Sequence, residues 1–184
     1  AAAVKLRRQA REENEILKAE NERMAMELKA RFQPDNIIGR APEMQQVYTQ
    51  IDQVAKSPLP VLIVGEVGTG KGLVAEAVHF RSERNLGPFV RVHCASLPES
   101  VLDRELFGSE KGALVGVVNE APGRVEQAEG GTLFLDEVAE LSPNLQIKLL
   151  RLLQQGEIER VGARFPKKVN VRVICATTKN LQQL

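Results

Sequence analysis

Residues 61–71 read Val61-Leu62-Ile63-Val64-Gly65-Glu66-Val67-Gly68-Thr69-Gly70-Lys71. The first four are apolar and predict a short buried strand, and residues 72–80 predict a helix directly after the glycines. Glycines let backbone N–H groups turn inward around an anion, a helix start adds further N–H groups, and a lysine can reach terminal phosphates. We therefore predict a phosphate-binding loop here, and not merely a flexible turn.

On both sides of this loop, short apolar segments alternate with amphipathic ones. We expect helices at 42–56, 72–80, 98–107 and 143–154, and strands at 61–64, 89–94, 132–135 and 169–177. Such alternation is typical of an α/β fold, in which crossover helices flank a parallel sheet. A nucleotide would then bind at the ends of the strands.

Composition excludes several other classes of protein. The chain has 184 residues, 43% of them hydrophobic, which is enough for one substantial core. Its 25 basic and 24 acidic residues nearly cancel, so DNA contact is expected only through a domain outside this chain. Cys94 and Cys175 lie in apolar runs without metal-ligand spacing, which indicates reduced core residues. Neither a membrane span nor a signal peptide is present, and we expect a soluble, cytoplasmic protein.

The first 32 residues differ from the rest, because they contain no Gly or Pro. Ala, Glu, Lys, Arg and Leu dominate and predict one long helix. Apolar residues recur at heptad spacing, at Ala3, Ala10, Leu17 and Met24. Residues 1–33 are therefore expected to form a helical linker that pairs as a coiled-coil dimer. A solvated single helix between two domains is the alternative. The α/β core is expected at 34–184.

A second chemical signal is the pair Asp136-Glu137, which follows the apolar segment 133–135. Gly72 stands where the general motif has a Ser or Thr whose hydroxyl would touch Mg²⁺, so the metal must depend on another group. Asp136 suits Mg²⁺ coordination through water, and Glu137 can polarise an attacking water. Acidic pairs also occur in solvated turns, but a strand end in the same α/β unit favours a hydrolytic site.

Four segments together resemble the central AAA+ ATPase domain of bacterial enhancer-binding proteins, which remodel sigma-54 RNA polymerase. They are residues 65–71 (Walker A), 105–113, 130–137 (Walker B) and 149–162. The resemblance covers about residues 36–184. It implies a P-loop NTPase (AAA+) fold, ATP and Mg²⁺ as cofactors, and a ring oligomer, commonly a hexamer, with nucleotide between subunits. It also implies the sigma-54 RNA polymerase holoenzyme as partner.

The resemblance carries roles to individual positions. Asp136, also the metal residue, and Glu137 would serve hydrolysis, and Arg160 looks like the arginine finger that reaches a neighbour's γ-phosphate. Arg151 and Arg164 are alternatives, and each arginine could instead be a surface charge. Nucleotide would contact two sets of residues: Gly65, Glu66, Gly68, Thr69, Gly70, Lys71, Gly72 and Leu73 at the phosphates, and Ile37, Ile38 and Gly39 at the adenine.

The chain also departs from the family pattern. The polymerase-contacting loop of the family reads Gly-Ala-Phe-Thr-Gly-Ala, whereas residues 112–117 read Gly-Ala-Leu-Val-Gly-Val. Leu114, Val115 and Gly116 thus keep an apolar tip but lack the aromatic ring and the hydroxyl, which predicts weakened sigma-54 contact. His93 replaces an Asn that restrains the catalytic glutamate, and could still hydrogen-bond Glu137. Thr178 replaces a sensor Asn. We expect altered hydrolysis or coupling, with the fold and nucleotide binding retained.

Family members continue into a helical lid and often a DNA-binding helix-turn-helix domain. We expect a fragment or truncated protein without either, with weakened nucleotide binding. Three interpretations stay open: an ATP-hydrolysing remodeller of sigma-54 polymerase, which we favour; a nucleotide-dependent oligomeric regulator without sigma-54 contact; and a dimerisation module with a vestigial ATP site.

Overall fold

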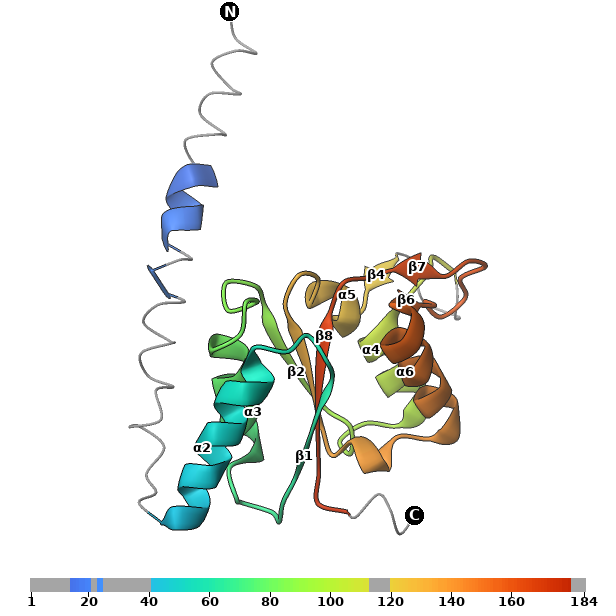
Figure 1. The fold of residues 1–184 in the computed structure, drawn as a ribbon. Helices are drawn as coiled ribbons and strands as arrows, with labels where there is room; N and C mark the ends of the chain where they lie inside the picture. Colours follow the sequence, from blue (N-terminus) through green and yellow to red (C-terminus); the bar gives the residue numbers. More distant parts are fainter. Residues whose placement is uncertain (1–13, 21–22, 25–40, 113–119, 180–184) are drawn as a thin grey trace, which may run out of the picture.

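The computed structural model describes residues 14–20, 23–24, 41–112 and 120–179 (Figure 1). Residues 14–20 and 23–24 are helical, as the N-terminal composition predicts. The rest of the expected helix at 1–33 and its pairing as a coiled coil lie outside the described residues, so both stay predictions. No helix in the described ranges has the length and apolar character needed to cross a bilayer.

A parallel sheet of four strands forms the centre of the fold (Figure 1). Its order is β1 (Val61–Val64), β8 (Arg172–Thr177), β5 (Thr132–Asp136) and β2 (Phe89–His93). Neighbouring strands in this order are far apart along the chain, and helices connect them, as the alternating sequence pattern predicts. Because all four strands run in one direction, their carboxyl ends lie along one edge of the sheet, where the candidate site is built.

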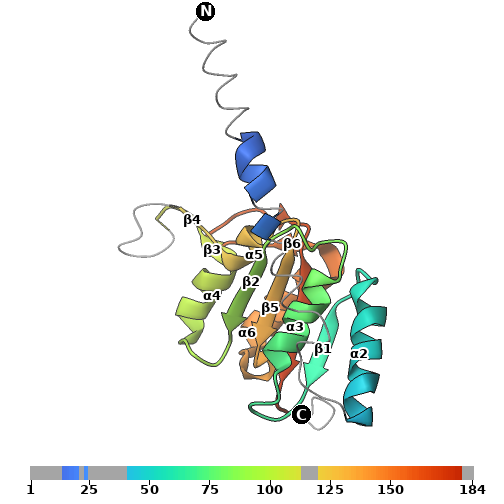
Figure 2. The ribbon, with the colours of Figure 1, turned by 90° about the vertical axis from the view of Figure 1, so that its left-hand side faces the viewer.

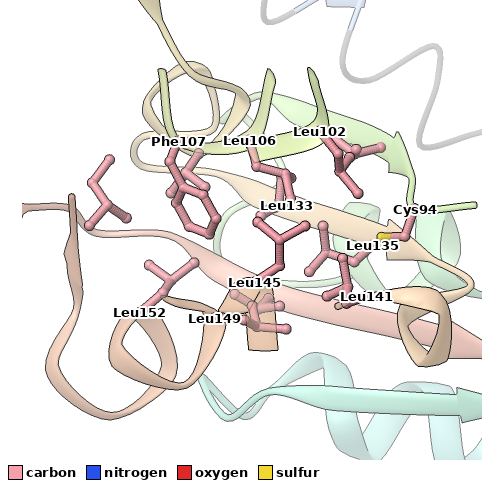
Figure 3. Packing of buried hydrophobic residues seen from close by; sticks show 14 of the residues in the cluster. Cys94, Leu102, Leu106, Phe107, Leu133, Leu135, Leu141, Leu145, Leu149 and Leu152 are labelled. Carbon is pink, nitrogen blue, oxygen red and sulfur yellow. The ribbon is translucent and has the colours of Figure 1, made fainter. Parts of the chain in front are cut away.

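Helices cover both faces of the sheet, and the sheet separates two hydrophobic clusters of the core (Figure 2). α2 (Pro42–Ala55) and α3 (Lys71–Phe80) pack against one face, around Phe134 and Ile174. The other face carries three helices, namely α4 (Glu99–Phe107), α5 (Arg124–Gln127) and α6 (Pro143–Gln155). Figure 3 shows this larger cluster, in which Leu133 and Leu135 of β5 meet leucines of α4 and α6. Both faces of β5 are therefore buried, as an uninterrupted apolar strand predicts.

Local signals fix the ends of α6. Ser142 precedes the helix and its hydroxyl accepts a hydrogen bond from the backbone N–H of Leu145 at 3.5 Å. Pro143 occupies the first helical position, where a missing N–H costs little. Gly156 ends the helix in the left-handed conformation at φ 64°.

Two expectations about the strands were wrong. β8 begins at Arg172 and not at residue 169, because Lys167–Lys168 (β7) pairs with Glu157–Ile158 (β6) in a separate hairpin. β1 is not fully buried: Leu62 and Val64 are 49% and 59% exposed. The reason is that β1 is an edge strand of the described sheet and only one of its faces is packed: Val61 and Ile63 pack against the cluster around Phe134, whereas Leu62 and Val64 belong to neither cluster.

The remaining elements are short. β3 (Gly108–Ser109) and β4 (Ala121–Pro122) form an antiparallel pair, and η2 (Val138–Glu140) is a single 3₁₀ turn after β5. Close backbone packing before β5 requires a glycine, since a Cβ at Gly131 would lie 2.1 Å from the carbonyl oxygen of Pro88. This contact aligns the start of β5 with that of β2.

Candidate nucleotide-binding site

The loop between β1 and α3 has the backbone geometry of a phosphate cradle. Gly68 and Gly70 adopt left-handed conformations at φ 81° and 87°, and Gly70 directly precedes α3. A side chain at Gly65 would place its Cβ 2.9 Å from Oγ1 of Thr69, whose hydroxyl donates to the carbonyl of Glu66 at 2.8 Å. The loop therefore curls tightly, and the helix N-terminus behind it presents free N–H groups to an anion.

The side chain of Lys71 is curled into this loop. It is 9% exposed, and its Nζ donates to the carbonyl oxygens of Gly65 and Glu66 at 2.9 and 3.0 Å. The same Nζ lies 3.6 Å from Oε1 of Glu137. The ammonium thus stands between the loop and the end of β5, where phosphate oxygens could replace the backbone carbonyls as its acceptors.

The acidic pair lies at the carboxyl end of β5, next to the loop. Asp136 is the last residue of the strand, and its side chain is 11% exposed. Glu137 follows with φ 57°, and is the only non-glycine residue with positive φ among those described. A left-handed conformation costs a side-chain-bearing residue about 1–2 kcal/mol, and such conformations cluster at functional sites. Both carboxylates face the cleft beside Lys71.

Thr178, at the expected sensor position, contacts the carboxylate of Glu137. Its backbone N–H and its hydroxyl both donate to Oε2 of Glu137, each at 3.1 Å. Thr178 follows β8, the strand adjacent to β5. One oxygen of Glu137 is thereby held toward β8, and the other points toward Lys71.

His93 does not contact Glu137, contrary to the suggested hydrogen bond. Its Nδ1 lies 3.6 Å from Oδ2 of Asp136. The reason is register: His93 is paired with Asp136 across the sheet, whereas the left-handed turn at Glu137 directs that carboxylate toward the opposite neighbour, β8.

Arg91 is a site residue that the sequence reading missed. Its Nη2 donates to Oδ2 of Asp136 at 2.5 Å, and its guanidinium lies 5.3 Å from the centre of the Phe134 ring. The sequence held a signal for this contact, because Arg91 and His93 are two residues apart and so lie on the same face of β2, which ends beside the acidic pair.

These groups line one open cleft. Its walls are Val67, Gly68, Gly70, Lys71, Gly72, Leu73, Glu76, Arg91, His93, Asp136 and Glu137. Within the described part of the chain, no three His, Cys, Asp or Glu side chains are grouped to hold a metal by themselves. Asp136 could hold a divalent cation together with the phosphates of a nucleotide.

Arg160 lies elsewhere in this chain and is held by carboxylates. Its Nε and Nη2 donate to Oε1 and Oε2 of Glu126 at 2.7 and 2.8 Å, and Nη1 donates to Glu110 and Glu120 at 3.2 and 3.5 Å. Hydrogen bonding from Arg160 lowers the pKa of Glu126 to about 2, and the same contact raises the pKa of Arg160. A role as arginine finger stays a prediction, and it would require the guanidinium to leave these partners.

Arg151, an alternative candidate for the arginine finger, lies outside the cleft. Arg151 donates to Glu159 at 2.6 Å in an exposed pair, away from the cleft. Six predicted contact residues lie outside the described part of the chain: Ile37, Ile38 and Gly39 for adenine, and Leu114, Val115 and Gly116 for the polymerase.

Comparison with known proteins decides the family. A family model described as the sigma-54 interaction domain matches residues 37–184. This chain belongs to the sigma-54 interaction domain family. The match includes the glycine loop, the acidic pair and Thr178, so the geometry above is that of a sigma-54 interaction domain.

Several relatives of this sigma-54 interaction domain are named Nif-specific regulatory proteins or nitrogen fixation proteins. The Nif-specific regulatory protein of Azotobacter vinelandii is 50% identical over 164 residues, which cover 89% of this chain and 31% of that protein. Nitrogen fixation protein VnfA of the same organism is 51% identical over 172 residues, 94% of this chain and 33% of VnfA. The chain therefore spans about a third of these relatives, which have further parts.

Solved structures agree on the fold. NtrX from Brucella abortus in complex with ADP has a TM-score of 0.73 and 38% identity, covering 91% of this chain and 36% of NtrX. The P-loop NTPase domain of the sigma-54 transport activator from E. coli has a TM-score of 0.51 at 21% identity, with 79% of this chain and 82% of that domain covered. The predicted α/β P-loop NTPase fold is confirmed.

Proposed function

We propose that this sigma-54 interaction domain binds and hydrolyses ATP with Mg²⁺, and that it drives a transcriptional regulator that remodels the sigma-54 RNA polymerase holoenzyme in the cytoplasm. The observation that carries the proposal is the left-handed glycine loop with Lys71 curled into it, 3.6 Å from Glu137. NtrX, which is 38% identical, has been solved with ATP and with ADP, and this supports an adenine nucleotide in the cleft.

Three charged residues of the cleft have defined roles in this proposal. Lys71 would exchange the carbonyls of Gly65 and Glu66 for terminal phosphate oxygens. Asp136 would hold Mg²⁺ through water, and Mg²⁺ would offset the negative charge of the phosphates. Glu137, oriented by Thr178, would polarise the attacking water.

We further propose that the domain works as a ring oligomer, commonly a hexamer in this family, with nucleotide between neighbouring subunits. Residues 1–33 would add a dimer contact, and DNA would be bound only through another part of the protein. The shared domain with Nif-specific regulators supports the regulatory role. Arg160 would reach the nucleotide of the neighbouring subunit and complete its site, provided that this subunit draws the guanidinium away from Glu126.

A second candidate function rests on residues 112–117, whose apolar sequence lacks an aromatic ring and a hydroxyl. In this version the domain keeps nucleotide-dependent assembly but has lost contact with sigma-54. A dimerisation module with a vestigial ATP site is the third version. Nucleotide turnover and polymerase binding separate the three.

The first experiment measures ATP affinity by fluorescence anisotropy of a labelled nucleotide, and ATP turnover by phosphate release. Lys71→Ala should abolish measurable binding, whereas Glu137→Gln should bind ATP normally and lose turnover. Lys148→Ala is the matched control, because Lys148 pairs with Asp103 outside the cleft. Unchanged binding by the Lys71 variant would refute the proposal, and turnover that is independent of Glu137 would refute the hydrolytic role.

The second experiment tests the partner. Sigma-54 is mixed with the protein in the presence of a transition-state nucleotide mimic, and retention is measured by pull-down. Retention by the natural sequence supports the first candidate. Retention only after Leu114→Phe and Val115→Thr supports the second, because those changes restore the ring and hydroxyl of the family loop.

A further inference from the structure

The position after the loop lysine has an unusual neighbour. A Cβ at Gly72 would lie 3.0 Å from Nη1 of Arg91, and 3.5 Å from its Cζ and Nη2. The guanidinium of Arg91 therefore packs against the bare backbone of Gly72, on the side where a Ser or Thr would project its hydroxyl. The residue that the general motif uses to touch Mg²⁺ is absent here, and a cation from β2 stands in its place.

Only the guanidinium end of the Arg91 side chain is held by contacts that the structure describes. Nη2 donates to Asp136, and the guanidinium lies over the Phe134 ring, yet the side chain as a whole is 52% exposed. Asp136, in contrast, is 11% exposed. The acid is thus fixed by the strand, and its partner is a flexible side chain that lines the open cleft. Because the Arg91 side chain is half exposed, water weakens its attraction to Asp136, so the position of Arg91 is better explained by the site than by the stability of the fold.

The cleft without nucleotide concentrates negative charge around Asp136. Glu76 and Glu137 also line it, and Arg91 partly offsets the desolvation that raises the pKa of Glu76. Lys71 stands 3.6 Å from Glu137, and the guanidinium of Arg91 on Asp136 adds a second positive charge that makes these carboxylates compatible with one another. A divalent cation brought by a nucleotide would compete for the same carboxylate and would repel the guanidinium.

We propose that Arg91 is a displaceable counter-ion of Asp136, which leaves this carboxylate when a Mg²⁺-nucleotide enters and turns to the terminal phosphates. The inference rests on the proposed function and deepens it, since it adds a phosphate-facing residue to the same cleft. Arg91 donates through a planar fork that suits phosphate oxygens as well as carboxylates, so the exchange needs only side-chain rotation.

The test is a Mg²⁺ titration of ATP binding to Arg91→Gln, Arg91→Lys and the natural sequence. Without the guanidinium, among the described residues only the imidazole of His93, 3.6 Å away, remains beside Oδ2 of Asp136. The half-saturating Mg²⁺ concentration should therefore fall about tenfold, which equals about 1.4 kcal/mol. The preference for ATP over ADP at saturating Mg²⁺ should also fall, because a cation near the terminal phosphate is lost. Arg91→Lys keeps a charge and should restore most of both properties.

Controls separate this inference from the proposed function. Arg124→Gln removes a guanidinium from an exposed pair with Glu105 outside the cleft and should change neither property. If Lys71→Ala abolishes binding but Arg91→Gln keeps the natural Mg²⁺ midpoint and nucleotide preference, the inference fails and the proposed function stands. If Lys71→Ala binds normally, the proposed function itself fails.

A steric variant tests the contact at Gly72 independently. Gly72→Ala adds a Cβ that should push the end of Arg91 aside without adding any ligand for Mg²⁺. It should lower the Mg²⁺ midpoint by less than Arg91→Gln does, because the guanidinium has to yield by only a few tenths of an ångström. In the Arg91→Gln background it should cause no further decrease. If the two substitutions change the Mg²⁺ midpoint additively in the double variant, and the thermal melts are unchanged, displacement of Arg91 is not their shared cause.

Discussion

The contact between Arg160 and Glu126 gives a prediction whose size follows from the structure. Glu126→Gln keeps the shape of the side chain but removes its charge, and leaves Arg160 without its bidentate partner. The pKa of Glu126 falls from 4.5 to about 2 in the folded chain. At about 1.4 kcal/mol per pKa unit, this shift corresponds to about 3 kcal/mol of stability. The Glu126 side chain is 8% exposed, so solvent screening reduces this value little.

The sign of the pH dependence follows from the same shift. A carboxyl with a lowered folded pKa contributes its full stability above pH 4.5, and loses it as the pH falls from 4.5 toward 2. Urea denaturation at pH 7 should therefore show Glu126→Gln to be about 3 kcal/mol less stable than the natural sequence. The difference should shrink below pH 4.5.

A control and a contrary result complete this experiment. Glu159→Gln breaks the exposed pair with Arg151 and should cost less than about 1 kcal/mol. A loss below about 0.5 kcal/mol for Glu126→Gln, or a pH profile equal to that of the natural sequence, would refute the reasoning. Arg160→Ala should also be destabilising, since Glu126 then keeps only Lys167 as a partner and Glu110 and Glu120 lose their contacts with the guanidinium.

The same variant tests the finger role of Arg160. Subunits with Arg160→Ala are mixed with subunits with Glu137→Gln, each inactive alone. If Arg160 acts on a neighbour, some interfaces in the mixed ring combine an intact Glu137 with an intact Arg160, and ATP turnover returns. If Arg160 only stabilises its own chain, mixing restores nothing.

Three further predictions concern the remainder of the chain. Burial lowers the pKa of His79 from 6.5 to about 4, so the free energy of unfolding should fall by about 3 kcal/mol as the pH falls from 6.5 to 4. Urea denaturation of His79→Gln should not show this dependence of stability on pH. Gly131→Ala should lower the melting temperature strongly in a thermal scan, because its Cβ would lie 2.1 Å from the Pro88 carbonyl oxygen. Thr178→Val should leave ATP affinity unchanged but slow phosphate release about tenfold, since Glu137 loses one of its two orienting hydrogen bonds.

The parts of the fold that depend on local sequence could be predicted. The strand, glycine loop and helix around Lys71 occur where the pattern places them, because each has its own signal within a few residues. The burial of β1 could not be predicted in this way. A run of four apolar residues is compatible with a central or an edge strand, and only the strand order decides between them.

Pairings across the structure were also beyond the sequence pattern. Arg160 meets carboxylates from three separate segments, at Glu110, Glu120 and Glu126, and nothing near it in the sequence indicates them. The contact of Arg91 with Asp136 required the register of β2 against β5. Side-chain partners that depend on register follow from the assembled sheet and not from any single segment.

The backbone at Glu137 has a consequence for how this protein can evolve. A glycine would relax that left-handed residue, and a single base change converts a glutamate codon into a glycine codon. The same change would remove the carboxylate that accepts from Thr178 and lies beside Lys71. A lineage that no longer needed the acid could therefore exchange it for a relaxed backbone in one mutational step.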